Sequence, residues 1–430
     1  MSQTAGATGA GSGPFGGGVS LHLPDSRAAL HDFHAELMQT VNAAKAGDGG
    51  AQWSPAVRAM AGLIDGDAVI RMYVEEMLAQ VQALPGAPPS TVTTIEDLLG
   101  ALNVIVTLAP LYNPVPSKRH AFPMSSLFAF MMMTVAGESL FRNRAYNGAI
   151  QAVLQEWCAY LNGADSASVL NDTYTGWISQ SAIDEFELTQ FVFDPSLPHG
   201  GWASYNEFFH RQIKLAEYRP VAAPDDVKVV VSANDGNLVS IARGVQLSDR
   251  FWLKGEPFSL VDMLNHSEYA DRFVGGDVVQ TFLSGGNYHR WRAPIAGTVR
   301  YAEVVDGLMF SDAESAGWDP NGVLSEGYYA AVNTRGLVFI ESGDPVLGMV
   351  CVIPIGITEI SSVEITVKAG EKVEKGDQLG YFSYGGSTLA LVFEHGAIDH
   401  FTAPSPPKGA FDPGDGPPIQ VNAQIAVANV

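Results

Sequence analysis

The sequence has few cysteines and no long apolar run. Its 430 residues include two cysteines, Cys158 and Cys351, whose separation matches no metal-binding spacing. We therefore expect two reduced thiols, no disulfide and a reducing compartment. The strongest apolar candidate, residues 127–135, is a run of about nine residues, whereas a membrane-spanning helix needs about 20. This comparison predicts a buried helix there and no integral membrane segment.

Basic residues are also scarce. The chain carries 24 Lys and Arg against 46 Asp and Glu, which gives a formal charge of −22. This charge repels phosphate backbones and anionic lipid surfaces, and no Lys/Arg cluster offers a local exception. We expect no nucleic-acid partner. The same charge favours a small soluble substrate over a lipid in a negative membrane.

Signals for secretion and for metal binding are missing as well. Residues 1–18 are rich in Gly, Ser and Ala and have neither the basic nor the apolar region of a signal peptide, so we expect a disordered tail and a cytoplasmic location. The 10 histidines show no spacing such as HExxH, so we predict no metal site.

The first half of the chain has the periodicity of helices. Apolar residues recur with helical spacing from Leu30 to Val41, after a possible cap at residues 25–26, and again from Val69 to Met77. Thr94 and Asp97 have the spacing of a capping box. Together with residues 125–146, which contain three consecutive methionines, and residues 153–161, these segments predict a helical N-terminal domain over 19–190.

After a connector over 191–225 the apolar period changes to two. Short apolar runs are separated by Gly and Pro, as in an all-β sandwich or barrel-like domain. The runs are residues 227–231, 238–242, 278–282, 298–304, 337–341, 346–354 and 363–367. The predicted fold class is α+β, in which the helical domain is followed by a β-rich domain over 226–430.

The segment Tyr384-Gly385-Gly386-Ser387-Thr388 interrupts two further apolar runs, residues 378–382 and 389–393. Small residues leave the Gly386 carbonyl open to attack by the Ser387 hydroxyl. Such an attack would move the acyl group from nitrogen to oxygen. Elimination of the ester would then cut the chain and leave dehydroalanine at position 387, which water converts to a pyruvoyl group with loss of ammonia. By itself the motif is weak evidence, because Gly and Ser are common between strands.

Several other segments accompany this junction in a fixed order. They are Phe208-Phe209-His210-Arg211 with Arg219-Pro220, Ser232-Ala233-Asn234-Asp235-Gly236, residues 254–260, Tyr288-His289-Arg290, Asn333 with Arg335, residues 354–360 and residues 373–380. In these segments the chain resembles the phosphatidylserine decarboxylase family, and more closely its soluble amino-acid decarboxylase branch of the L-tryptophan type. The resemblance covers roughly the C-terminal half of the chain.

The resemblance implies an enzyme, a carboxy-lyase, that is made as a zymogen and cuts itself between Gly386 and Ser387. Its cofactor is then a covalent pyruvoyl group derived from Ser387, which condenses with the substrate amine and accepts the electrons of the breaking bond. The expected substrate is a soluble L-amino acid, with an aromatic one such as tryptophan as the first choice. The two fragments are expected to stay bound to each other, and the sequence leaves the oligomeric state undecided.

Two other functions stay open beside this one. The chain can be a phosphatidylserine decarboxylase that makes phosphatidylethanolamine, or an unprocessed, non-enzymatic member of the family. Flotation with liposomes separates the first from a soluble amino-acid enzyme, and an uncleaved chain supports the second.

The resemblance assigns Asp235 and a histidine to catalysis and to activation of Ser387. Many family members carry a second histidine three residues after the first. In this chain the first is His289, and the position three residues later is Arg292. An arginine cannot act as a base near neutrality. Three interpretations remain. His289 serves both maturation and protonation, or Asp235 activates Ser387 directly or through water while Arg292 holds a carboxylate, or maturation is impaired. Arg292 can also bind the substrate carboxylate.

Each of these residues also has a structural explanation without the family. Asp235 precedes a glycine and is typical of a turn, and His289 lies in an aromatic stretch where a core histidine is common. Asn333 and Arg335 can simply order a loop.

Overall fold

The computed structural model describes most of the chain. The described residues are 27–46, 52–87, 89–115, 118, 122–251, 258–314, 324–359, 362–407 and 413–430. The predicted tail over 1–18, the possible cap at residues 25–26 and much of the 254–260 motif lie outside them.

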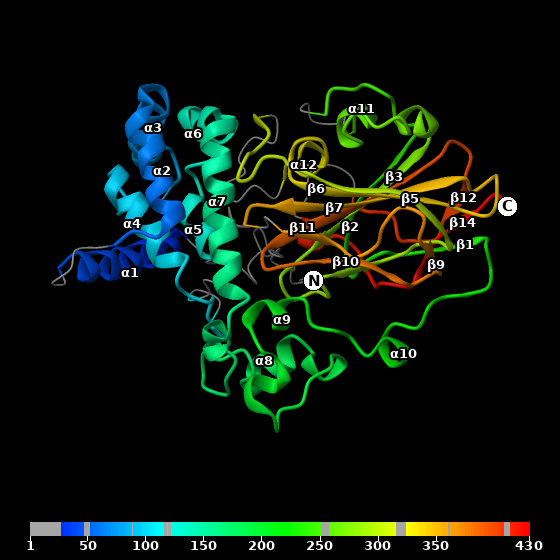
Figure 1. Cartoon of the computed structure of the whole chain (residues 1–430), viewed down its shortest axis with the longest axis horizontal. Helices are drawn as coiled ribbons and strands as arrows, with labels where there is room; N and C mark the ends of the chain where they lie inside the picture. The colour runs from blue at the N-terminus through cyan, green and yellow to red at the C-terminus, as the bar shows by residue number, and fades with distance from the viewer. Residues whose placement is uncertain are drawn as a thin grey trace, which may run out of the picture.

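Helices fill the N-terminal part, as predicted, and form a layer beside the strands (Figure 1). The capping box is confirmed, because the Thr94 side chain accepts from the Asp97 amide and the Asp97 carboxylate accepts from the Thr94 amide. The principal helices are α1 (Arg27–Ala46), α2 (Pro55–Gly66), α3 (Ala68–Ala83), α4 (Ile95–Ile105), α5 (Pro123–Phe128), α6 (Val135–Phe141), α7 (Arg144–Leu161), α8 (Gln180–Glu185), α9 (Tyr205–Phe209) and α10 (Leu215–Tyr218).

Two details of the helical prediction were wrong. The run over 127–135 is not one buried helix, because α5 ends at Phe128 and Phe130 takes a positive φ of 65° before α6 begins. Met131 and Met132 are nevertheless buried, as core filler. In α3 the predicted apolar stripe is shifted, because Val69 is 54% exposed and the buried face includes Ile70 instead.

The strands form one large antiparallel sheet and two small ones. The large sheet has the order β13-β2-β3-β11-β7-β6-β5-β9, and the small sheets are β4-β10-β8 and β1-β14-β12. The strands are β1 (Val229–Val231), β2 (Gly236–Arg243), β3 (Asp277–Leu283), β4 (Arg290–Arg292), β5 (Gly297–Val305), β6 (Arg335–Glu341), β7 (Met349–Ile357), β8 (Val363–Ile365), β9 (Lys372–Val373), β10 (Gln378–Phe382), β11 (Gly386–Phe393), β12 (Ile398–Phe401), β13 (Pro418–Ile419) and β14 (Gln424–Ala428).

Both faces of the large sheet are covered. Along β11, Leu389 and Leu391 point into a core shared with the small sheets, whereas Ala390 and Val392 point into a second core. The second core also contains residues of α11 (Leu260–Met263) and α12 (Glu326–Val332). The α+β class is therefore confirmed, while the domain limits at 190 and 225 stay predictions.

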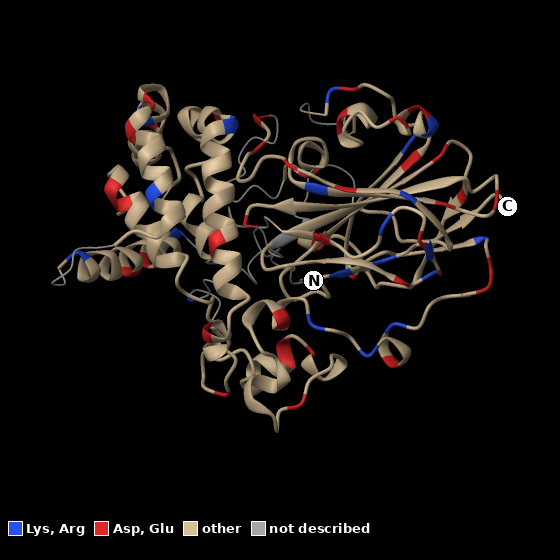
Figure 2. Cartoon of the chain, viewed as in Figure 1, with Lys and Arg blue, Asp and Glu red and all other residues tan. Residues whose placement is uncertain are grey.

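The helical layer packs directly on the β-rich part. One apolar core joins most of the helices to Tyr288, Phe310 and Tyr384, and Asn147 of α7 donates to the Met309 carbonyl at 2.8 Å. Acidic residues are dispersed over both parts rather than gathered on one element (Figure 2). No described helix has the length and apolar character needed to cross a membrane.

Candidate active site

Ser387 lies near the start of β11, in the interior of the large sheet. It pairs with Leu283 of β3 on one side and with Gly356 of β7 on the other. The chain reaches it from β10 through a short turn in which Gly385 has a φ of +142°, a conformation that favours glycine. The side chain of Ser387 is completely buried.

The Ser387 hydroxyl has no hydrogen-bond partner in the described part of the chain. It shares a face of β11 with Leu389, so it points toward the core beneath the small sheets. A buried hydroxyl without a partner costs about 1–3 kcal/mol of desolvation, and native proteins leave few of them. Such a group is better explained by chemistry than by stability.

His289 lies between β3 and β4 and is also completely buried. Its ring stacks on Phe209 of α9, with 4.0 Å between the ring centroids. Its carbonyl accepts from the Phe382 amide at 2.9 Å, and Phe382 is the last residue of β10. The structure therefore places His289 beside the strand that leads into the Gly386-Ser387 junction.

Asp235 lies at the same end of the large sheet. Asn237 of β2 pairs with Phe282, and the next residue of β3, Leu283, pairs with Ser387. Asp235 and Ser387 are thus near one level, two strand spacings or about 10 Å apart across the sheet. No hydrogen bond joins the Ser387 hydroxyl to Asp235 or to His289 in this arrangement.

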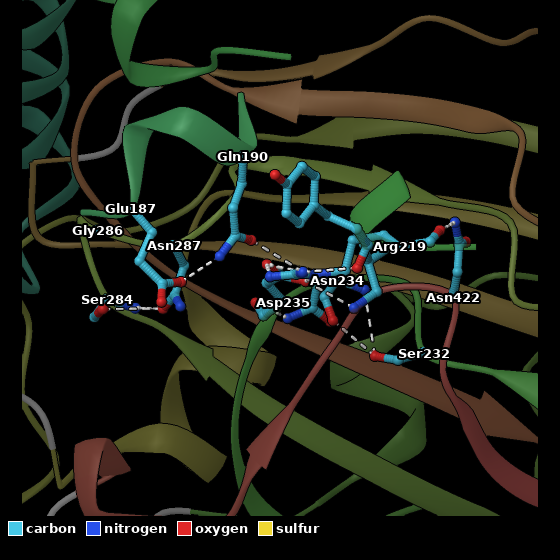
Figure 3. A network of polar contacts seen from close by, with 12 residues as sticks. Glu187, Gln190, Arg219, Ser232, Asn234, Asp235, Ser284, Gly286, Asn287 and Asn422 are labelled. Carbon is cyan, nitrogen blue, oxygen red and sulfur yellow. Dashed lines mark hydrogen bonds and ion pairs between the residues drawn. The ribbon is translucent and has the colours of Figure 1, made fainter. Parts of the chain in front are cut away.

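The Asp235 carboxylate is held by an arginine that the sequence analysis left without a role. Arg219 donates to its two oxygens from Nε and Nη2, each at 3.0 Å (Figure 3). The Val421 amide donates to Oδ1 at 2.8 Å. Gln190 accepts from Arg219 Nη1 at 3.2 Å. This bidentate pair, which is largely buried, fixes the orientation of the carboxylate.

Arg292 does not pair with a carboxylate among the described residues. Its Nη2 donates to the Tyr288 hydroxyl at 2.9 Å and its Nη1 to the Gly376 carbonyl at 2.8 Å. Its backbone amide donates to the carbonyl of Ala233, two residues before Asp235. Arg292 therefore lies in the same region as Asp235, but its guanidinium binds the Tyr288 hydroxyl and the turn at Gly376.

Asn333 and Arg335 support the strand next to Ser387. Asn333 Nδ2 donates at 2.8 Å to the carbonyl of Gly356, the residue that pairs with Ser387. Arg335 donates to the Asn333 carbonyl at 2.9 Å and to carbonyls of α11. The two residues order a loop, and through it they fix the backbone that pairs with Ser387.

Glu359 is a further buried acid near the junction. It follows β7 by two residues, and its Oε1 accepts from the Met124 and Ser125 amides at the start of α5, the latter at 2.9 Å. Its Oε2 has no partner in the described structure. Burial raises the pKa of Glu359 to about 8, although the two amides lower it. It belongs to the 354–360 motif, but its helical partners are distant in sequence.

Comparisons with known proteins identify the family of the chain. A family model described as phosphatidylserine decarboxylase matches residues 205–409, and a second model with the same description matches residues 54–186. The chain is 41% identical over 292 residues to decarboxylase iboD of Amanita muscaria, covering 63% of this chain and 83% of that protein. The chain belongs to the phosphatidylserine decarboxylase family.

Other relatives come from both branches of this family of carboxy-lyases. An L-tryptophan decarboxylase of Psilocybe cubensis is 29% identical over 79% of this chain and 81% of its own length. Phosphatidylserine decarboxylase proenzyme 3 of Schizosaccharomyces pombe is 32% identical over 49% of this chain and 20% of its own length. The predicted family is confirmed. The roles of Ser387, His289, Asp235 and Arg292 stay predictions.

Proposed function

We propose that this protein is a pyruvoyl-dependent decarboxylase of a small L-amino acid, activated by cleavage of its own Gly386-Ser387 bond. The observation that carries the proposal is the buried, unpartnered Ser387 hydroxyl, directly after two glycines and at the start of a central strand. Decarboxylases among the relatives, two of them named for L-tryptophan, support an amino-acid substrate with an aromatic side chain.

The residues around Ser387 fit a pyruvoyl precursor. The hydroxyl is free to attack the Gly386 carbonyl, and glycine at that position offers no side chain to block the attack. A pyruvoyl group formed there supplies a ketone that condenses with an amine and accepts electrons as carbon dioxide leaves. Because the position is buried, bulk water is kept from the site.

His289 is the base and acid in this proposal. Its ring is held against Phe209 beside the end of β10, and we assign it the removal of the proton of the Ser387 hydroxyl and the later delivery of a proton to the substrate carbon. We assign Asp235 to the activation of Ser387 together with His289. Arg219 fixes the orientation of the Asp235 carboxylate at the end of the sheet where Ser387 lies. Arg292 remains a candidate for the substrate carboxylate, because a guanidinium has five N–H donors.

The charge of the chain supports a soluble substrate. Its −22 formal charge opposes docking on anionic lipid, and acidic residues are spread over both parts of the fold (Figure 2). A phosphatidylserine assay on vesicles tests the lipid alternative. Turnover of vesicle-bound phosphatidylserine together with inactivity on free amino acids would replace the proposed substrate class.

The intact mass of the purified protein is the decisive measurement. We expect two fragments in place of one 45.8 kDa chain, residues 1–386 and a C-terminal piece of 430 − 386 = 44 residues with a blocked N-terminus. Hydroxylamine should add to the ketone of the smaller piece. The matched control is Ser387→Ala, which should stay a single unreactive chain.

One observation favours the unprocessed alternative. Arg292 occupies the place of the family's second histidine, and an arginine cannot act as a base near neutrality. A wild-type chain that stays single and unreactive, like the Ser387→Ala control, would overturn the proposed enzyme and leave a non-enzymatic family member.

A further inference from the structure

The ring of Tyr384 is enclosed by four other aromatic rings. Phe122 stacks on it with 5.4 Å between centroids and 12° between planes. Trp157, Tyr205 and Phe209 meet it edge to face at 5.1, 5.4 and 5.3 Å. We call these four residues the aromatic cage. Only 5% of Tyr384 is exposed, so its ring fills the cage.

The cage and its occupant come from different parts of the fold. Phe122 immediately precedes α5, Trp157 belongs to α7, and Tyr205 and Phe209 belong to α9, all on the helical side. Tyr384 instead lies in the turn between β10 and β11, three residues before Ser387. The helical side therefore forms a pocket for a ring that the β-rich side supplies.

Tyr384 is anchored from both directions as long as the chain is intact. On one side β10 ends at Phe382, and on the other β11 is fixed between β3 and β7. The Tyr384 amide also donates to Asn206 Oδ1 at 3.0 Å. Cleavage after Gly386 removes the anchor in β11 and leaves Tyr384-Gly385-Gly386 as a new C-terminus. Two glycines give this tail wide conformational freedom.

The cage also lies next to the proposed chemistry. Phe209 contacts both Tyr384 and His289, so one wall is shared with the residue that we expect to transfer protons. A substrate amine that reacts at position 387 brings its own side chain within a few bonds of that position. Parallel stacking on Phe122 and edge contacts from the other rings favour a flat aromatic group over an aliphatic one.

We propose that the aromatic cage is the pocket for the substrate side chain, that it accepts a planar aromatic ring, and that Tyr384 plugs it until self-cleavage. This inference rests on the self-cleavage proposed above. In the mature enzyme the tail carrying Tyr384 competes with the substrate for the cage, which lowers the fraction of enzyme that is ready to bind.

Binding of indole to uncleaved variants tests the pocket without any catalysis. Indole has no amine that can react with a ketone, and its binding is measurable by calorimetry or ligand-observed NMR. In Ser387→Ala the cage stays plugged, and we expect no more than weak binding. Adding Tyr384→Ala should open the cage and tighten indole binding about tenfold or more. Adding Tyr384→Phe keeps the plug and should not tighten it.

A cavity of similar size elsewhere is the matched control. Tyr146 of α7 is also completely buried. Ser387→Ala with Tyr146→Ala therefore removes a buried ring but leaves the cage filled. Indole binding as tight as that of the Tyr384→Ala variant would show only a generic cavity and would overturn the proposal. Circular dichroism checks that each variant folds, and Tyr384→Leu, which removes less volume, replaces the alanine variant if that one does not.

The mature enzyme gives a second measurement, the change in KM caused by Tyr384→Ala. The sign of that change shows whether Tyr384 blocks the pocket or forms part of its wall. If the tail competes for the cage, Tyr384→Ala lowers KM for an aromatic amino acid by about threefold or more, because the competent fraction rises. If Tyr384 is a permanent wall of the pocket, the same change raises KM, and the proposal is refuted. A wild-type chain that does not cleave defeats the proposed function instead, and the indole experiment still decides whether the cage is a pocket.

Discussion

Replacing Glu359 by glutamine should remove a pH dependence of folding stability that originates at the contact between the helical layer and the sheet. The carboxyl is 2% exposed, and the described structure contains no ion pair for it. Its pKa is raised by burial from 4.5 to about 8. Tyr205 and Tyr384 face it, and burial raises the pKa of both phenols well above 10, so they stay neutral over this range.

The sign and the size of the effect follow from this difference in pKa. Between pH 4.5 and 8 the folded state holds a proton that the unfolded state has released, so the free energy of unfolding falls as pH rises. Each pKa unit corresponds to about 1.4 kcal/mol, so the change from 4.5 to about 8 gives a loss of about 5 kcal/mol as an upper value. The loss begins near pH 4.5 and is complete once the pH exceeds about 8.

Denaturant unfolding at several pH values between 4 and 9 measures this loss. Both proteins should carry Ser387→Ala so that a single chain unfolds. Glutamine keeps an oxygen for the Met124 and Ser125 amides, so the Glu359→Gln variant should match its parent near pH 4.5 and exceed its stability near pH 8. Exposed Glu75 of α3 is the matched control, and Glu75→Gln should leave the curve unchanged. Parallel curves for the parent and Glu359→Gln would refute the reasoning.

Substitutions at three other residues address the site. Arg219→Met leaves a buried carboxylate unpaired and should cost about 3–5 kcal/mol in denaturant unfolding and slow self-cleavage, whereas Arg243→Met, at a more exposed pair, should cost less than about 1 kcal/mol. Asn333→Leu removes the support opposite Ser387 and should cost about 1–3 kcal/mol and slow cleavage measured by gel electrophoresis. Arg292→His should speed cleavage, and Arg292→Lys should raise KM; an unchanged KM would remove Arg292 from substrate binding.

Local signals made the fold predictable from sequence. The capping box at Thr94 and Asp97 lies within four residues, and β10 coincides with the apolar run over 378–382. The methionine segment was misjudged because an apolar run has the same appearance in a helix and in a buried turn. The break there depends on the positive φ of Phe130, which single-residue propensity does not predict.

Only the residues of the site that belong to recognisable motifs could be predicted from the sequence. Ser387, His289 and Asp235 stand out by resemblance, but their partners are set by the tertiary fold. Arg219 reaches Asp235 from the connector, and Glu359 meets amides more than 230 residues earlier in the chain. Such contacts between distant segments follow no fixed spacing in the sequence. The sequence therefore predicts the reacting residues but not the residues that hold them in place.

The position of the scissile bond explains how self-cleavage can preserve the fold. The 44-residue C-terminal piece would keep nearly all of β11, with β12, β13 and β14. Its β11 pairs with β3 and β7, its β13 with β2, and its β14 with β1, all of them strands of the larger fragment. The proposed cleavage would therefore remove one covalent bond while the strand pairings and the apolar cores remain. The freedom that it creates would be concentrated in the tail that ends at Gly386. Activation of this enzyme would then need no separation of its fragments, only the movement of the residues that precede the new carboxyl terminus.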